Sequence, residues 1–170
     1  MNTLFTNARI LVSTGEVIAG CLGVTDKLIA FTGEVPEDFK AQRVIDCEGD
    51  LLMPGLVNAH THLAMTLFRN AADDMELSSW LRERIWPLED QLTGEDAYWG
   101  TMLAAAECIR GGCTCVNDMY FFMDRTAQAV ADAGIRAMLG QGIVTGNDDG
   151  KSRLALAKSL FEEFDGAEDG

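Results

Sequence analysis

A repeated alternation of strand and helix patterns after Pro54-Gly55 is the feature that most restricts the fold of this chain. Three short apolar runs predict strands, and an amphipathic stretch follows each of them. The predicted strands are Leu56–Ala59, Cys113–Asn117 and Ile135–Leu139, and the predicted helices begin near Thr93, Asp124 and Leu154. Repeated β-α units imply a parallel sheet, which is either open and doubly wound or closed into a barrel.

The length of the chain limits how much of a barrel it can build. A complete eight-unit barrel needs roughly 250 residues, whereas the whole chain has 170 residues and shows three such units. Before Pro54 the sequence instead holds short apolar runs, Leu4–Val12, Val17–Val24 and Leu28–Phe31, separated by turn residues. These runs predict a small antiparallel β unit, which needs a second layer to bury its apolar face.

The balance of charges argues against two classes of partner. The chain has 27 acidic and 13 basic residues, and its net charge of −14 opposes approach to nucleic acid phosphates or to an anionic membrane. No apolar run approaches the roughly 18 residues of a membrane span, and the N-terminal sequence lacks the pattern of a secretion signal. We therefore expect a cytoplasmic protein that binds neither nucleic acid nor membrane.

Five cysteines are present, an odd number with irregular spacing, as expected of reduced thiols in a cytosolic protein. Cys113 and Cys115 share one face of a predicted strand, which raises the question of a metal site. The two-residue spacing of zinc knuckles is absent, however. We favour packing over metal ligation for both, because free cysteine is usually buried.

The residues that point to chemistry are His60 and His62, at the end of the first strand of the β-α series. They are the only histidines in the chain and lie in the segment MPGLVNAHTHL. Histidines one residue apart on a strand project to the same side, so both imidazoles can reach one divalent ion. The alternative is a pair of loop histidines with local hydrogen bonds. We favour metal ligands, because parallel-sheet enzymes place their chemistry at this edge.

The segment MPGLVNAHTHL, preceded by VIDCEGDLL, resembles the first barrel strand of the metal-dependent amidohydrolase superfamily, whose members carry a His-x-His metal pair there. Two further segments, SSWLRERIWPLED and GGCTCVNDMYFF, are similar to the 5′-methylthioadenosine/S-adenosylhomocysteine deaminases and their close relatives. The resemblance covers essentially the whole chain. It implies an α/β fold in which residues 1–52 form a small antiparallel β unit of a composite β-sandwich. Residues 53–170 then form the first three β-α units of a TIM-like (β/α)8 barrel that is incomplete in this chain.

The resemblance also implies an activity, the hydrolytic deamination of an adenosine-type nucleoside such as 5′-methylthioadenosine, S-adenosylhomocysteine or adenosine. A divalent metal, first of all Zn²⁺, activates the water that releases ammonia, and His60 and His62 are two of its ligands. The remaining ligands and the acid/base come from later barrel strands. We therefore expect no catalytic residue within this chain, and we expect the 170 residues alone to be inactive.

Glu89 and Gln141 are the substrate-binding candidates that the resemblance implies. Glu89 stands where family members grip the ribose hydroxyls, and the two oxygens of a carboxylate suit a vicinal diol. The alternative for Glu89 is a solvated acid beside Asp90. Gln141 stands where members that accept S-adenosylhomocysteine carry an arginine, so we expect weaker binding of that substrate's carboxylate, unless Lys151 or Arg153 compensates. Gln141 would otherwise only close its strand.

Asp118 ends the second predicted strand, where it either supports the site or forms a turn with Asn117. Other functions stay open as well. A guanine or cytosine deaminase or a triazine chlorohydrolase would share the histidine pair but would not need Glu89. From another class, the chain would be an inactive fragment or a non-enzymatic interaction protein on the same scaffold. An unclosed sheet would also expose apolar edges, so a homo-oligomer is a further expectation.

Overall fold

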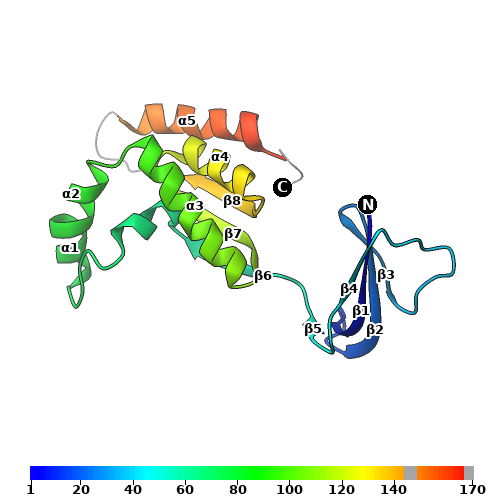
Figure 1. Cartoon of the computed structure of the whole chain (residues 1–170). Coiled ribbons are helices and arrows are strands. Elements are labelled where there is room, and N and C mark those ends of the chain that lie inside the picture. Colours follow the sequence, from blue (N-terminus) through cyan, green and yellow to red (C-terminus); the bar gives the residue numbers. More distant parts are fainter. Residues whose placement is uncertain (144–148, 167–170) are drawn as a thin grey trace. The chain divides into compact units, whose positions relative to one another are not determined.

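The computed structural model describes residues 1–143 and 149–166. They belong to two compact units, Met1–Pro54 and Gly55–Gly170, each of which has its own sheet (Figure 1). The boundary falls at the Pro54-Gly55 step, where the sequence pattern also changes. In the ranges that the structure covers, no helix combines the length and the apolar character needed to cross a bilayer.

The first unit is one five-stranded sheet. Strand β1 (Asn2–Leu11) pairs antiparallel with β2 (Val17–Thr25), which pairs antiparallel with β3 (Leu28–Gly33). On its other side, β1 pairs parallel with β4 (Arg43–Asp46) and with β5 (Leu51–Leu52). The sheet is therefore mixed, and the prediction of an antiparallel unit is wrong for β4 and β5. The reason is that the chain after β3 crosses back to the free side of β1 instead of turning into a hairpin.

The second unit contains a parallel sheet in its described part. Strands β6 (Leu56–Thr61), β7 (Cys113–Tyr120) and β8 (Arg136–Gln141) lie in this spatial order. Neighbours in sequence are thus neighbours in the sheet, as in the first units of a barrel. This order confirms the expected fold class.

Helices connect and cover these strands. Helix α3 (Gly94–Arg110) leads into β7, and α4 (Met123–Ala133) leads into β8; the two helices lie side by side along the sheet (Figure 1). In β7, Val116, Asp118 and Tyr120 are buried, whereas the alternate residues Asn117 and Met119 are exposed. One face of the sheet is therefore covered, and its core cluster consists of Leu63, Ala104, Ala105, Val116, Val130 and Ile135.

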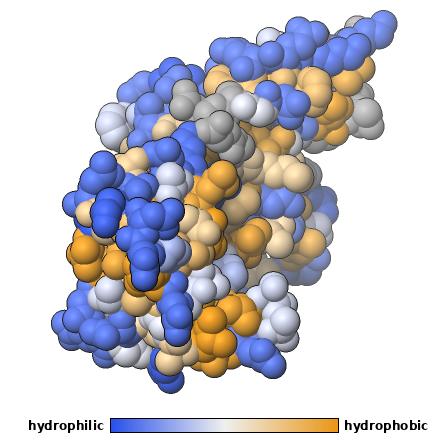
Figure 2. Space-filling model, turned by 90° about the vertical axis from the view of Figure 1, so that its right-hand side faces the viewer, coloured by the Kyte–Doolittle hydropathy of each residue, from blue (hydrophilic) through white to orange (hydrophobic). Residues whose placement is uncertain are grey.

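Helix α5 (Asp149–Phe164) follows β8 and is the last described element of this unit. The partly buried residues Arg153, Ala157, Leu160 and Phe164 recur at helical spacing and define its inner face. At the top of the view in Figure 2, the upper surface is hydrophilic and hydrophobic atoms lie beneath it. Leu160 packs against the second core cluster, which consists of Ala64, Ala97, Tyr120 and Met123.

The segment between β6 and α3 is helical in two places. A 3₁₀ helix (Leu63–Phe68) follows β6 directly. Further on, α1 (Leu77–Trp80), a π-helical turn (Leu81–Ile85) and α2 (Trp86–Glu89) form one continuous run. The N–H of Trp86 donates to the carbonyl of Leu81 across the wide turn. Pro87 follows at once and has no N–H to donate, so the π-turn lies where the regular hydrogen-bond pattern is interrupted in any case.

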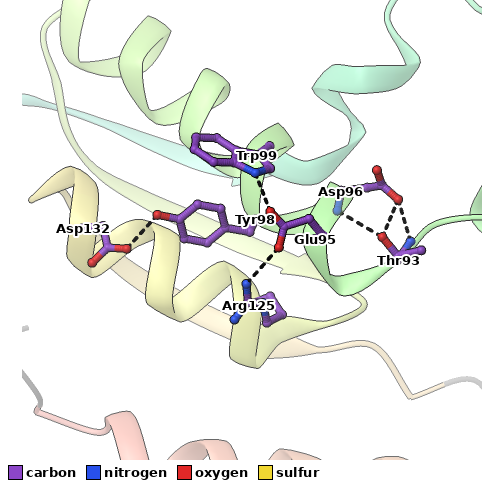
Figure 3. Close-up of polar contacts among 7 residues, drawn as sticks. All are labelled: Thr93, Glu95, Asp96, Tyr98, Trp99, Arg125 and Asp132. Atoms are coloured by element: carbon purple, nitrogen blue, oxygen red, sulfur yellow. Dashed lines mark hydrogen bonds and ion pairs between the residues drawn. The ribbon is translucent and has the colours of Figure 1, made fainter.

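Helix α3 begins with a capping box at Thr93. The Thr93 hydroxyl accepts a hydrogen bond from the backbone N–H of Asp96 at 3.2 Å, and the Asp96 carboxylate accepts one from the N–H of Thr93 at 2.9 Å (Figure 3). Two of the N–H groups that a helix start leaves unpaired are thereby satisfied. The sequence predicted this start from Thr93, and the structure confirms it.

Polar side chains connect α3 to α4 on the outer surface. The Tyr98 hydroxyl donates to Asp132 at 2.8 Å, and the Arg125 guanidinium lies 5.4 Å from the centre of the Tyr98 ring (Figure 3). Arg125 also reaches Glu95 at 3.4 Å. Glu95 and Asp132 are exposed, so solvent screens these contacts and each contributes little to stability. The buried apolar residues beneath them hold the two helices together.

The capping box gives a prediction for stability. We expect Thr93→Ala to lower the free energy of unfolding of the complete protein by about 1 kcal/mol, because the N–H of Asp96 loses its acceptor. Thr93→Ser keeps the hydroxyl and should stay close to wild type. Urea unfolding of the three proteins measures the difference, and equal losses in the alanine and serine variants would contradict the role of the hydroxyl.

Candidate active site at the carboxyl edge of the sheet

The carboxyl ends of the three parallel strands bring polar side chains to one edge. In the register of the sheet, Thr61 of β6 is paired with Asp118 of β7, and Tyr120 of β7 is paired with Gln141 of β8. His62 directly follows β6 and therefore lies at the same edge. This is the edge at which parallel α/β enzymes place their chemistry.

His60 and His62 lie close to each other, as the spacing predicts. Their ring centres are 5.1 Å apart and the rings are inclined at 78°. His60 is exposed, and His62 is half-buried. The side-chain amide of Asn117 donates to the carbonyl of Ala59 at 3.1 Å, which fixes the backbone just before His60. Two imidazoles at this separation are close enough to serve one ion.

One ring nitrogen of His62 is already engaged. Nδ1 of His62 lies 2.6 Å from the carbonyl oxygen of Met119. A carbonyl can only accept, so this hydrogen bond assigns the proton to Nδ1. Nε2 then carries the free lone pair. This is the usual arrangement of a metal-binding histidine, in which a backbone carbonyl fixes the tautomer and the orientation of the ring.

Asp118 fixes the chain on both sides of His62. Its side chain is 1 % exposed, and Oδ1 accepts hydrogen bonds from the N–H of Leu63 and from the hydroxyl of Thr61, both at 2.7 Å. Burial raises the pKa of Asp118, while these two hydrogen bonds oppose the rise. Oδ2 has no hydrogen-bond partner among the described residues. Of the two predicted roles, the structure thus places Asp118 in support of the His62 segment.

Tyr120 connects this strand end to Glu89. The buried Tyr120 hydroxyl donates to Oε1 of Glu89 at 2.6 Å, and its ring centre is 5.8 Å from that of His62. Burial, followed by the proximity of Glu89, raises the pKa of Tyr120, so the phenol keeps its proton. Sequence reasoning did not identify Tyr120, because a contact across 31 residues leaves no local pattern. The predicted strand also ended at Asn117, three residues before Tyr120, so its position at a strand end was not visible in the sequence.

Glu89 and Gln141 line the same cavity, which has a volume of about 440 Å³. Trp86 and Phe121 give it aromatic walls, and Arg153 of α5 adds a cation. Its size and mixed lining are typical of sites for small molecules. The lining does not include His60 or His62. The structure therefore brings the two substrate-binding candidates together in one cavity, whereas His62 lines a separate cavity with Thr61 and Leu63.

Gln141 and Arg153 both approach the backbone at Gly142. The Gln141 amide donates to the carbonyl of Gly142 at 3.1 Å, while its own buried Oε1 has no partner in the part of the chain that the structure describes. The Arg153 guanidinium donates to the same carbonyl at 3.5 Å and lies 4.7 Å from the centre of the Phe121 ring. A positive charge is thus held in the cavity beside Gln141. The alternative compensating residue, Lys151, is exposed and is not part of the lining.

The donor set fits a zinc-class ion in chemistry but not in number. Imidazole nitrogens are common zinc ligands, and a catalytic zinc site needs three protein ligands. Within residues 1–143 and 149–166, no group of three or more His, Cys, Asp or Glu side chains is placed to hold an ion. His60 and His62 can therefore supply only part of a site. All five cysteines are free thiols, and Cys113 and Cys115 are half-buried.

Comparison with known proteins gives close matches along the whole chain. It is 43% identical over 170 residues to 5-methylthioadenosine/S-adenosylhomocysteine deaminase of Desulforudis audaxviator, covering 98% of this chain and 40% of the relative. It is 44% identical over 155 residues to 5′-deoxyadenosine deaminase of Methanobrevibacter smithii, covering 90% and 36%. The structure resembles a zinc-bound adenosine deaminase from Xanthomonas campestris with a TM-score of 0.88 and 32% identity, covering 98% of this chain and 40% of that one.

These matches define both the family and the extent of the likeness. The chain spans about 40% of the length of the first curated relatives that it matches. Residues 51–170, which include the whole β6-β7-β8 sheet and its helices, match the amidohydrolase family. The histidine pair at the end of β6 and the sequential parallel strands agree with this match. The chain belongs to the amidohydrolase family.

Proposed function

We propose that the protein containing this chain is a metal-dependent hydrolase that removes the exocyclic amine of an adenosine-type nucleoside as ammonia. The substrates that we propose are 5′-methylthioadenosine, S-adenosylhomocysteine and adenosine. The observation that carries the proposal is the position of Glu89, which lines a cavity and is hydrogen-bonded to Tyr120, whose ring centre lies 5.8 Å from that of His62. The names of the relatives, which are deaminases of adenosine derivatives, support the same substrate class.

His60 and His62 would hold a divalent metal, which we propose to be zinc. The hydrogen bond from Nδ1 of His62 to Met119 leaves Nε2 as the nitrogen that would bind the ion. A divalent ion in such a site lowers the pKa of a water molecule towards about 7, which provides a nucleophile at neutral pH. The other ligands and the acid/base would come from parts of the family fold beyond these three strands.

Glu89 would bind the ribose. A carboxylate accepts hydrogen bonds at two oxygens, so it can take a proton from each hydroxyl of a vicinal diol. The cavity around it has aromatic walls from Trp86 and Phe121, which suit a flat purine or the apolar part of a nucleoside. A guanine or cytosine deaminase or a triazine hydrolase acts on a substrate without ribose and would gain nothing from this carboxylate. The position of Glu89 in the cavity therefore favours a nucleoside.

Metal binding gives a prediction for the complete protein. We expect His60→Ala and His62→Ala each to lose most of the bound metal and nearly all turnover, because each change removes one neutral nitrogen ligand. Cys113→Ala and Cys115→Ala serve as controls and should keep the metal, since we assign these thiols to packing. Metal analysis of the purified variants and an ammonia-release assay measure both effects. Wild-type metal content in both histidine variants would contradict the proposal.

The ribose contact gives a second prediction. Glu89→Ala should lower kcat/KM for adenosine and 5′-methylthioadenosine about a hundredfold, since a lost pair of charge-assisted hydrogen bonds corresponds to roughly 3 kcal/mol. Turnover of free adenine, which lacks the ribose, should change little. Glu83→Ala removes the same charge from an exposed place on the same helical segment and is the matched control. An unchanged preference for ribosides in Glu89→Ala would assign Glu89 to the solvated surface.

Gln141 gives a third prediction, for substrate choice. A neutral amide cannot pair with a carboxylate, so Gln141→Arg should raise kcat/KM for S-adenosylhomocysteine relative to 5′-methylthioadenosine by about tenfold. Arg153 lines the same cavity, so Arg153→Ala tests whether this cation already compensates. A selective loss of S-adenosylhomocysteine activity in Arg153→Ala would show compensation. No gain in Gln141→Arg would mean that Gln141 only closes its strand.

A further inference from the structure

Tyr120 holds one oxygen of the Glu89 carboxylate and leaves the other available. The hydroxyl donates to Oε1 at 2.6 Å. Among the described residues, none donates a hydrogen bond to Oε2 of Glu89, and the side chain lines the cavity. A carboxylate that is fixed at one oxygen can turn only about that contact. The remaining lone pairs then point in a restricted set of directions.

The two residues differ in burial, since Glu89 is half-buried and Tyr120 is buried. Glu89 ends α2, a four-residue helix that follows the π-turn, whereas Tyr120 ends β7 and is 5 % exposed within the core cluster of Ala64, Ala97 and Met123. A half-buried glutamate side chain at the end of this helical run would otherwise sample several rotamers, and a ligand would have to order it on binding. The buried tyrosine supplies a fixed point on the sheet. The hydrogen bond from its hydroxyl thus restricts the positions that the Glu89 carboxylate can adopt.

The same strand end also positions His62. The carbonyl of Met119 accepts the hydrogen bond from His62, and the next residue, Tyr120, donates to Glu89. Met119 acts through its backbone carbonyl and Tyr120 through its side chain, so one segment of β7 contacts both His62 and Glu89. Two adjacent residues thus link His62 and the Glu89 carboxylate to the same strand end.

We propose that Tyr120 is a positioning residue that orients Glu89 for the hydroxyls of the substrate. This inference rests on the proposed role of Glu89 in binding ribose. Tyr120 itself touches neither the diol nor the reacting amine. Its contribution is to present Oε2 in one direction, so that the cost of ordering the carboxylate is met during folding and not during binding.

The test is Tyr120→Phe in the complete, metal-loaded protein, compared with Glu89→Ala and the double variant. Adenosine and 2′,3′-dideoxyadenosine form the substrate pair, since the second lacks both hydroxyls. We expect KM for adenosine to rise about tenfold in Tyr120→Phe, with kcat and the kinetics of the dideoxy analogue little changed. In the Glu89→Ala background, the phenylalanine should cause no further loss, because its target is gone.

Tyr98→Phe is the matched control, because it deletes another tyrosine–carboxylate hydrogen bond, to Asp132, away from the cavity. It should leave both substrates unaffected. Equal losses for adenosine and the dideoxy analogue in Tyr120→Phe would indicate a general packing defect and overturn the inference. A silent Tyr120→Phe beside an impaired Glu89→Ala would overturn the role of Tyr120 alone. A silent Glu89→Ala would remove the ribose contact, and the role of Tyr120 with it.

Discussion

The geometry of the candidate site depends on the hydrogen bonds that Asp118 accepts. One buried oxygen of this residue accepts from Thr61 and from Leu63, the two neighbours of His62, and so joins the end of β6 to β7. Strand pairing alone would leave the residues after Thr61 without a partner, since β6 ends there. A buried carboxyl group is costly unless it is hydrogen-bonded. Here its hydrogen bonds fix the backbone on either side of His62, a proposed metal ligand. A mobile backbone at this point would leave the imidazole poorly placed to bind an ion.

The parts of the site are held in different ways. His60 and His62 are held by the backbone of a strand and by the adjacent end of β7, whereas Glu89 stands at the end of a short helix after a π-turn. π-turns are frequent at functional sites, and this one precedes Pro87, which cannot donate a hydrogen bond. Among the described residues, Tyr120 is the side chain that donates a hydrogen bond to Glu89.

Much of the fold was predictable because it rests on local patterns. The order of strands and helices after Pro54, the start of α3 at Thr93 and the proximity of His60 to His62 follow from periodicity, capping and strand geometry. The predicted strand ranges end too early, at Ala59 and Asn117, whereas β6 continues to Thr61 and β7 to Tyr120. The parallel pairing of β4 and the Tyr120–Glu89 contact were missed because both depend on residues far apart in the sequence.

The alternation of β7 explains how one strand serves both the core and the site. Val116, Asp118 and Tyr120 are buried, yet only Val116 has an entirely apolar side chain. Towards the carboxyl end, the buried residues change from apolar to polar, and each polar group finds its partner on a neighbouring element: Asp118 at Thr61 and Leu63, Tyr120 at Glu89. Buried polar groups of this kind specify unique partners where apolar ones would accept many. The first part of β7 thus packs in the core, whereas its carboxyl end holds polar groups in place. Enzymes of this fold place their catalytic groups at that end of the strands.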